Sequence, residues 1–163
     1  MGEKLRGRIQ KQSLENCDLI QAAGCLLFAQ NTGRVLTLLR SNTRYSNTWG
    51  LAGGKVDAGE TVVEGLMREI AEEIGTVAIT KTIPLETFTS ADSKFAFYTF
   101  MCIVGNEFIP ALNHEHAGYA WTTIDNLPRP LHPGVYATIA VDDVIREKAH
   151  VVARQYFNPS PAN

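Results

Sequence analysis

Three glutamates in the segment REIAEEIG are spaced so that they could bind one divalent cation together. Glu69, Glu72 and Glu73 occupy positions i, i+3 and i+4, which places their carboxylates on one patch of a helix. Like charges at this spacing cost roughly 0.2–0.5 kcal/mol per pair on an exposed helix. A divalent cation would turn that repulsion into coordination, and oxygen ligands are those that Mg²⁺ or Mn²⁺ prefers. The simpler alternative is a solvated acidic helix face.

The segment before these glutamates favours metal binding over the simpler alternative. Residues 41–59 are rich in Ser, Asn, Thr and Gly and too long for an ordinary turn, so they predict a functional loop. Its glycines allow the backbone to approach a metal or a phosphate closely. Arg68 can pair with Glu64 or Glu72 four residues away and hold the carboxylates in place. We assign Glu64 to the capping box that begins at Thr61.

Strands and helices alternate around this segment. Apolar residues at three- and four-residue spacing predict a helix over 61–74 that ends before Gly75. Residues 31–33 predict a tight turn between the first two strands, 125–128 a turn or short helix, and 133–157 a largely helical tail. The order strands, helix, strands, helix indicates an α/β fold with a mixed sheet between helices. The strands are expected over 20–30, 34–40, 77–81, 94–104 and 117–124.

Length and charge narrow the classes of protein further. The 163 residues, 45% hydrophobic and 20% charged, have the size of one globular domain over 1–163, with 1–16 expected as a flexible N-terminal tail. The net charge of −2 argues against binding to nucleic acid or to an anionic membrane as the main task. No stretch approaches the ~20 apolar residues of a membrane span. Cys17, Cys25 and Cys102 match no disulfide framework, and we expect reduced core thiols in a cytoplasmic protein.

The segment from Gly54 to Thr76 resembles the Nudix box, which is written G-x5-E-x7-R-E-U-x-E-E-x-G-U, where U is an aliphatic residue. Thr76 occupies the last position, where an aliphatic residue is usual. Residues 49–54 resemble the entry loop of the family, with Ala52 where proline is common. The resemblance implies the Nudix fold, an α/β/α sandwich, in agreement with the order of elements above. The matching residues are Gly54, Glu60, Arg68, Glu69, Ile70, Glu72, Glu73 and Gly75.

The resemblance also implies an activity and a cofactor. Nudix enzymes hydrolyse a nucleoside diphosphate linked to another group, and they use a divalent metal such as Mg²⁺ or Mn²⁺. Arg68 and Glu60 would orient the carboxylates, so Arg68 belongs to the implied catalytic residues. The implied metal ligands are Gly53, through its carbonyl, and Glu69, Glu72 and Glu73.

The general base is left open between Glu69 and Glu115. Glu115 lies in a segment that resembles an EHxxYxW stretch of several Nudix enzymes, where a glutamate supplies a late metal ligand or a base. The alternative for this segment is a polar loop whose histidines only hydrogen-bond to backbone. A zinc site built from His114, His116 and His132 is allowed by ligand type, but no ligand spacing supports it.

Aromatic and basic residues near the loop are candidates for nucleotide binding. Trp49 could stack on a base or pack in the protein interior. Arg40 and Arg44 flank the loop and could grip a phosphate, although exposed loop arginines commonly have no such role. Alternation along one strand places most of its aromatic rings in the core and at most one toward a substrate: Phe95, Phe97, Tyr98 and Phe100.

We therefore expect a metal-dependent pyrophosphohydrolase that favours nucleoside triphosphates, native or damaged, because no extra domain for a larger second group is visible. The alternatives are a hydrolase of nucleotide sugars or ADP-ribose and a non-catalytic nucleotide-binding module. A Nudix-like isomerase of isoprenoid diphosphates would need a cysteine and histidine metal environment that the three cysteines do not visibly supply. The expected partner is a small-molecule nucleotide. Residues 133–157 are left open as a lid or as the surface of a homodimer.

Overall fold

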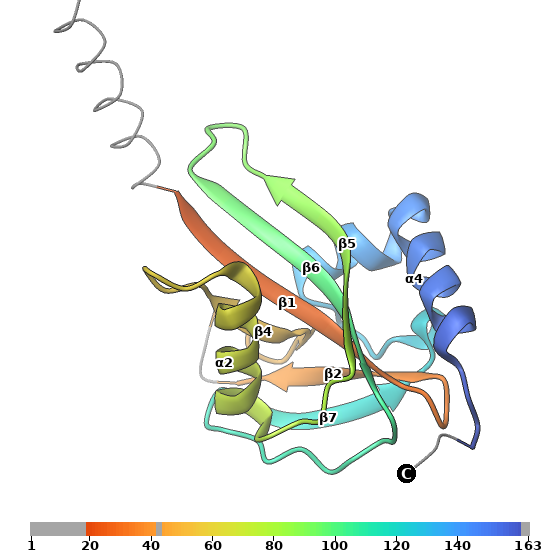
Figure 1. Cartoon of the computed structure of the whole chain (residues 1–163). Helices are drawn as coiled ribbons and strands as arrows, with labels where there is room; N and C mark the ends of the chain where they lie inside the picture. The colour runs from red at the N-terminus through yellow and green to blue at the C-terminus, as the bar shows by residue number, and fades with distance from the viewer. Residues whose placement is uncertain (1–18, 42–43, 161–163) are drawn as a thin grey trace, which may run out of the picture.

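A seven-stranded mixed sheet forms the centre of the computed structural model, which describes residues 19–41 and 44–160 (Figure 1). The expected tail over 1–16 and Cys17 lie outside the described residues. The strands are β1 (Ile20–Ala29), β2 (Arg34–Arg40), β3 (Trp49–Gly50), β4 (Ala52–Lys55), β5 (Lys81–Thr89), β6 (Phe95–Val104) and β7 (His116–Thr122). The helices are α2 (Val62–Ile74), the 3₁₀-helix η1 (Ile124–Asn126), α3 (Pro133–Val135), the π-helix η2 (Tyr136–Ala140) and α4 (Asp143–Tyr156).

Strand β1 organises the sheet because it pairs with three neighbours. It runs parallel to β6 along its whole length, from the pair Ile20 and Phe95 to the pair Ala29 and Val104. Its first half also pairs with the antiparallel strand β4, and its last residues pair with β2. Strand β5 continues the sheet beyond β6, while β3 and β7 both pair with β2. The glycine-containing strand β4 is thereby held beside β1, one strand away from β6.

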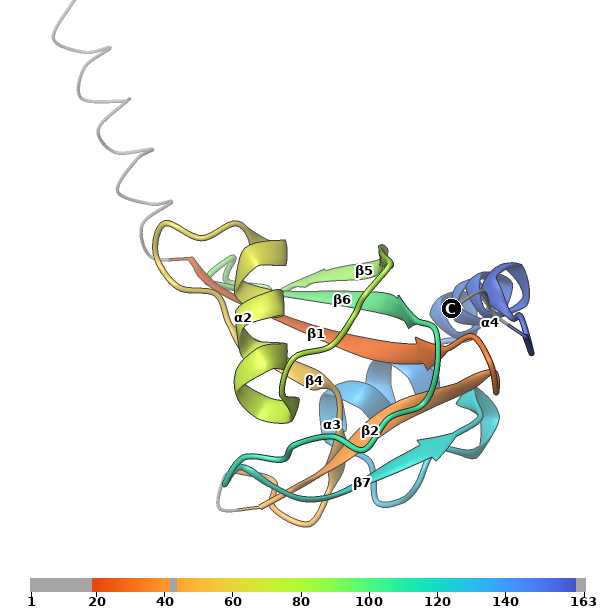
Figure 2. The ribbon, with the colours of Figure 1, turned by 60° about the horizontal axis from the view of Figure 1, so that its bottom comes forward.

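Helices cover both faces of the sheet (Figures 1 and 2). Alternate residues of β1 point to opposite faces, so the sheet has one core on each side. On one face, Leu66, Ile70 and Ile74 of α2 pack with Ala23, Cys25 and Leu27. On the other face, Ile145, Ala149 and Val152 of α4 pack with Leu26 and Phe28. The predicted α/β/α sandwich is confirmed, and the two described cysteines, Cys25 and Cys102, are free and buried as expected.

Helix α2 begins and ends where the sequence predicts. The hydroxyl of Thr61 accepts the backbone N–H of Glu64 at 3.1 Å, so both residues take the predicted part in the N-terminal cap. Gly75 ends the helix with φ of 86°, a backbone conformation that residues with a side chain rarely adopt. The apolar stripe between these ends supplies the core contacts, and each such side chain stabilises the fold by about 1.5–3 kcal/mol when fully buried.

The strand predicted over 77–81 is wrong. Residues 75–80 form an irregular connection, and the strand starts only at Lys81 and continues to Thr89. Val77 and Ile79 gave this segment the β-branched pattern of a strand. Their side chains are apolar because they pack, partly buried, against the core beneath α2. Pro84 obscures the true strand, since proline lacks the N–H that a central ladder needs, and it lies next to a β-bulge. The other strand predictions are confirmed within about two residues.

The predicted helical tail is confirmed with one interruption. Asp142 ends the first helical segment and caps α4, because its carboxylate accepts the N–H groups of Val144 and Ile145 at 3.0 and 3.1 Å.

The predicted loop over 41–59 contains the short strands β3 and β4, and the turn predicted over 125–128 begins inside the 3₁₀-helix. No helix in the described part of the chain is long and apolar enough to cross a membrane.

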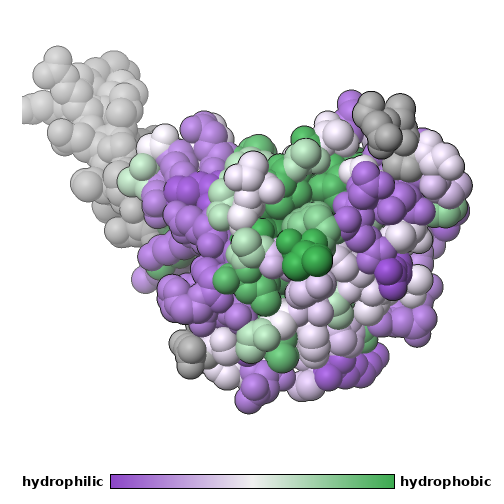
Figure 3. Space-filling model, turned by 90° about the horizontal axis from the view of Figure 1, so that it is seen from below, coloured by the Kyte–Doolittle hydropathy of each residue, from purple (hydrophilic) through white to green (hydrophobic). Residues whose placement is uncertain are grey.

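One face of the molecule carries an apolar area (Figure 3). In the view from below, apolar side chains gather near the centre of the face, between hydrophilic flanks (Figure 3). Single exposed apolar residues such as Ile109 and Val144, 85% and 80% exposed, are ordinary on protein surfaces.

Candidate active site

Arg68 gathers the carboxylates of the predicted site. Its Nε and Nη2 donate to the two oxygens of Glu60, both at 2.9 Å, and its Nη1 donates to Glu69 at 3.0 Å. The same Nη1 reaches Glu72 at 3.3 Å, so the predicted pairing four residues away is with Glu72, and Glu64 serves the cap instead. The hydrogen bonds from Glu60 and Glu69 raise the pKa of Arg68 above its usual value, so it stays charged. Arg68 therefore fixes three carboxylates, as the Nudix resemblance implies.

Glu73 is a buried carboxylate at the centre of the site. Its side chain is 4% exposed, and its Oε2 accepts the backbone N–H of Gly53 at 3.1 Å. Burial raises the pKa of Glu73 to about 8, although the hydrogen bond from Gly53 acts in the opposite direction. The charges of Glu69 and Glu115 raise it further, while Arg40 lowers it. Near neutral pH, Glu73 therefore holds its proton for most of the time, because the nearby positive charge does not offset its burial.

Two glycines of β4 bring the backbone against these glutamates. A Cβ added to Gly54 would lie 2.5 Å from Cδ of Glu69, so a side chain there would displace this carboxylate. Gly53 has φ of 145°, and its Cβ would lie 2.1 Å from the carbonyl oxygen of Ala23 in β1. Burial raises the pKa of Glu69, and Arg68 opposes this effect. The backbone at these two positions lies against Glu69 and β1, while its predicted approach to a metal or a phosphate stays a prediction.

Glu115, which lies far from the helix in sequence, is brought to the same cluster. Its charge raises the pKa of both Glu69 and Glu73, which places it within electrostatic reach of α2. Its own N–H donates to Oδ1 of Asn113 at 3.1 Å, and the N–H of Asn113 donates to the carbonyl of Glu73 at 3.1 Å. This chain of hydrogen bonds ties the loop before β7 to the end of α2. The choice of Glu69 or Glu115 as the base stays a prediction.

The histidines do not form the alternative zinc site. Within residues 19–41 and 44–160, no group of three or more His, Cys, Asp or Glu side chains is arranged to hold a metal ion. Nδ1 of His132 instead accepts the N–H of Gly134 at 3.0 Å and caps α3. Burial lowers the pKa of both His116 and His132, which favours their neutral forms.

The donor chemistry of the acidic cluster nevertheless suits a hard divalent cation. Glu69, Glu73 and Glu115 supply carboxylate oxygens, and Glu69 and Glu73 have pKa values raised by burial and by like charge. A bound cation would oppose the effects of both burial and like charge on these pKa values, since it favours the charged form of each carboxylate. The side chains now contact Arg68 and the N–H of Gly53. The ligand roles of Gly53, Glu69, Glu72 and Glu73 stay predictions.

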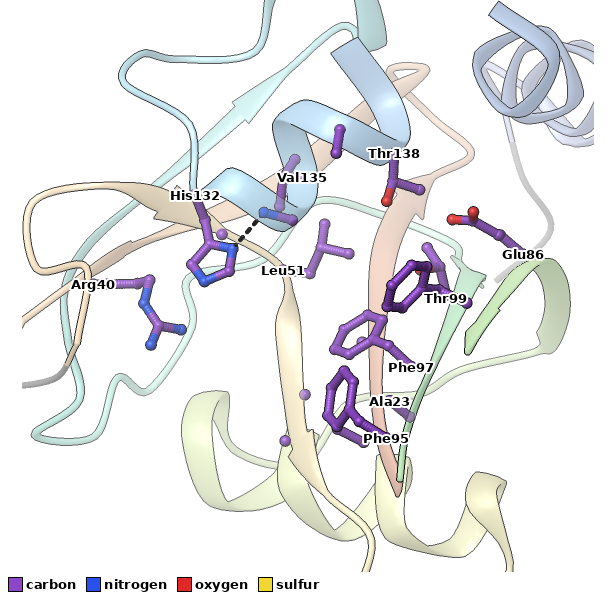
Figure 4. A pocket seen from close by; sticks show the side chains of 18 residues that line it. Ala23, Arg40, Leu51, Glu86, Phe95, Phe97, Thr99, His132, Val135 and Thr138 are labelled. Carbon is purple, nitrogen blue, oxygen red and sulfur yellow. Dashed lines mark hydrogen bonds between the residues drawn. The ribbon is translucent and has the colours of Figure 1, made fainter. Parts of the chain in front are cut away.

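A cavity of about 400 Å³ opens on the other side of the two glycines (Figure 4). Phe95 and Phe97 of β6 form one wall, and Leu51 and Val135 lie across from them. Phe88 of β5 also lines the cavity. Two rings of β6 line this cavity, and the prediction that at most one ring of this strand faces a substrate stays a prediction. Alternation along the strand explains the division: the odd-numbered rings face the cavity. On the opposite face, Phe100 is buried in the core and Tyr98 accepts a hydrogen bond from Gln21 at 3.0 Å.

Arg40 lines the cavity, whereas Trp49 does not. The guanidinium of Arg40 lies at one side of the cavity, held by a hydrogen bond of 3.0 Å from Nη2 to the carbonyl of Arg44. The guanidinium of Arg44 lies over the ring of Tyr45, 5.0 Å from its centre. Trp49 is half-buried in β3, where its backbone N–H donates to the carbonyl of Pro130 at 2.9 Å. Trp49 is not among the residues that line this cavity, and both interpretations of its side chain stay predictions.

Several residues of the cavity escaped the sequence analysis. Phe88 and Glu86 lie on β5, which was misplaced, and Thr138 lies in the π-helix of the tail. The alternation of residues within 85–89 was the pattern that could have revealed the strand. His132 was considered only as a zinc ligand, although it lines the cavity beside Arg40. The tail from Pro133 therefore forms part of the cavity wall, while its lid and dimer roles stay predictions.

The chain belongs to the Nudix family. A family model described as the NUDIX domain matches residues 18–141. Nucleoside triphosphatase NudI of Salmonella heidelberg is 32% identical over 123 residues, which cover 68% of this chain and 82% of that protein. The fold, the site and these relatives define a Nudix hydrolase, an enzyme that acts on phosphoric anhydride bonds.

Solved structures agree with this assignment. The Nudix hydrolase RenU of M. smegmatis superposes with a TM-score of 0.67 at 24% identity, covering 88% of this chain and 89% of that one. A MutT NUDIX hydrolase of Burkholderia pseudomallei superposes with a TM-score of 0.55 at 26% identity, covering 74% of this chain and 96% of that one. The family and the fold predicted from the box are confirmed.

Proposed function

We propose that this Nudix hydrolase is a metal-dependent pyrophosphohydrolase of nucleoside triphosphates. One observation carries the proposal: the phenylalanine-lined cavity and the buried glutamates meet at Gly53 and Gly54, which separate them by backbone alone. A volume of about 400 Å³ lies within the usual range of small-molecule sites. The relation to nucleoside triphosphatase NudI supports the choice of a triphosphate.

The cavity supplies binding groups for the two ends of a nucleotide. Base stacking on an aromatic side chain contributes about 1–3 kcal/mol per base, and Phe95 and Phe97 offer such faces. Arg40 is the cation at the cavity, and guanidinium groups bind phosphate oxygens with two parallel hydrogen bonds. Since Gly53 and Gly54 have no side chains, the phosphates can approach the backbone of β4 closely.

The acidic cluster is the proposed place of Mg²⁺ or Mn²⁺, with Gly53, Glu69, Glu72 and Glu73 as ligands. A bound cation of this kind neutralises charge on the pyrophosphate and lowers the pKa of a bound water. Arg68 keeps Glu69 and Glu72 in place through the hydrogen bonds described above, which limits the rearrangement needed for binding.

The proton of the attacking water needs an acceptor among the carboxylates of the cluster. Burial raises the pKa of Glu69 toward the range in which general bases work best. Glu115 approaches the same cluster from the loop before β7 and is the other candidate. Either one would accept the proton as water attacks phosphorus, releasing a nucleoside monophosphate and pyrophosphate.

A substrate panel tests the proposal. The full chain would be assayed for release of phosphate and pyrophosphate from nucleoside triphosphates, nucleotide sugars, ADP-ribose and dinucleoside polyphosphates, in Mg²⁺, in Mn²⁺ and in chelator. We expect metal-dependent release of pyrophosphate from triphosphates. Cleavage confined to nucleotide sugars or ADP-ribose would replace the proposed substrate. Nucleotide binding without any hydrolysis would identify a binding module.

A further inference from the structure

Glu86 is a carboxylate in a cavity that is otherwise largely apolar. It lies on β5, half-buried, and lines the cavity beside the phenylalanine rings. Within the described part of the chain, no hydrogen bond or ion pair involves its side chain. A half-buried carboxylate without a partner retains its full capacity to accept hydrogen bonds from a ligand.

A β-bulge at Leu85 directs Glu86 into the cavity. Beyond the bulge, Glu86 pairs with Thr99 and Phe88 pairs with Phe97. Residues directly opposite each other in an antiparallel pair have side chains on the same face of the sheet. The extra residue shifts the alternation of β5 by one, so that Glu86 and Phe88 share the face of Phe97. Without the bulge, Glu86 would point to the side of the sheet that α2 covers.

The bulge is held in place from the other side of the core. Nζ of Lys148 in α4 donates to the carbonyl of Leu85 at 3.2 Å, so this carbonyl has a partner despite the break in the ladder. The position of Glu86 is therefore set by tertiary contacts and does not depend on a flexible loop.

The polar groups of the cavity lie at two separate places. Figure 4 shows Arg40 and His132 at one side and Glu86 with Thr138 at the other, with phenylalanine rings between them. Anionic phosphates are attracted to Arg40 and repelled by Glu86. A nucleotide in this cavity therefore places its base toward Glu86 and the hydroxyl of Thr138.

We propose that Glu86 selects guanine nucleotides, an inference that rests on the proposed function because it assigns the base end of the same site. A carboxylate only accepts hydrogen bonds, and its two oxygens match two adjacent donors. The Watson–Crick edge of guanine presents such a pair, N1–H and N2–H₂. Adenine and cytosine place an acceptor beside their amino group, and uracil flanks its single N–H with two carbonyls. These acceptors would face the carboxylate and lose binding energy.

The test compares wild type with Glu86→Gln, which keeps the shape of the side chain but replaces one acceptor with a donor. Glu147→Gln is the matched control, because Glu147 is an exposed glutamate of α4 that pairs with Arg154 and lies outside the cavity. We would measure kcat/KM for GTP, ATP, CTP and UTP in Mg²⁺, and the Kd of each nucleotide in chelator. One bidentate base contact is worth about 1–3 kcal/mol, roughly a 5- to 150-fold preference. We expect wild type to prefer GTP in this range, Glu86→Gln to lose it, and Glu147→Gln to keep it.

The two readouts separate this inference from the proposed function. Hydrolysis of all four triphosphates without a guanine preference, or a preference that survives Glu86→Gln, would overturn the role of Glu86 and leave the proposed function in place. If binding is guanine-selective, Glu86→Gln abolishes this selectivity and no triphosphate is hydrolysed, the role of Glu86 would be supported. The proposed hydrolysis of nucleoside triphosphates would then be overturned. The absence of both binding and hydrolysis of triphosphates would overturn both.

Discussion

The two sides of strand β4 are built in different ways. On the α2 side, charged groups are crowded and almost all are paired, with Arg68 alone contacting Glu60, Glu69 and Glu72. On the cavity side, most of the lining is apolar, and the side chain of Glu86 has no partner among the residues that the structure describes. The first side comes mainly from one continuous segment, which Glu115 joins from a distant loop, whereas the second draws on six strands and the helical tail. The comparison teaches that the chemistry shared by a family can reside in one short segment, while the contacts to a substrate are assembled from the whole chain.

Glu73→Gln is expected to have a large effect on the α2 side. Loss of one group that stabilises charge in the reaction typically lowers kcat about 10²- to 10³-fold. The fold should persist, since the glutamine oxygen can still accept the N–H of Gly53. Steady-state kinetics in Mg²⁺ would measure the loss, with Glu64→Gln in the first turn of α2 as the control. Equal activity of both variants would remove Glu73 from the metal site.

Glu115→Gln and Glu69→Gln sharpen the comparison within the acidic cluster. General-base catalysis contributes about 10²- to 10⁴-fold, so the variant that lacks the base should lose this much and lose the acidic limb of its pH profile. The other variant should keep the shape of the profile with a smaller loss of rate. Rates measured between about pH 5 and pH 10 would decide, and two unchanged profiles would exclude both carboxylates as the base.

Phe97→Ala tests whether the cavity side binds the base. Loss of one stacking contact of about 1–3 kcal/mol should weaken nucleotide binding roughly 5- to 150-fold, mainly through KM. Tyr98→Phe is the neighbouring control, because Tyr98 points to the other face of the sheet, where its hydroxyl contacts Gln21. An unchanged KM in Phe97→Ala would show that the nucleotide does not use this wall.

The pH dependence of stability gives the smallest expected effect. The pKa of Glu73 is about 8 in the folded protein and ordinary in the unfolded chain, so the folded state binds more protons between about pH 5 and pH 8. Stability in chelator should therefore fall as the pH rises through this window, lowering Tm by several degrees. Glu73→Gln should flatten the dependence, and Mg²⁺ should restore the stability of wild type at pH 8. Parallel curves for wild type and Glu73→Gln would contradict this origin.

Local patterns in the sequence predicted the acidic side well. Thr61 and Gly75 delimit the helix because a cap and a left-handed position depend only on neighbouring residues. The spacing of Glu69, Glu72 and Arg68 follows from the period of the helix, and their contacts appear as expected.

The cavity side was predicted poorly because its decisive features are not local. Val77 and Ile79 resemble strand residues through their burial against α2, while Pro84 concealed the true strand. Most rings of β6 were expected in the core, and the sequence did not single out Phe95 and Phe97 as cavity residues, because alternation gives the two faces of a strand without showing what covers each.

The sequence by itself determined the family, the acidic helix α2 and the glycines beside it, since a helix period and a motif of 23 residues over 54–76 are local properties. The tertiary structure decided how buried Glu73 is, which loop brings Glu115 to it, and which side chains face the cavity. Burial, register and the bulge at Leu85 depend on residues far apart in the chain, and they set the pKa of one carboxylate and the direction of another.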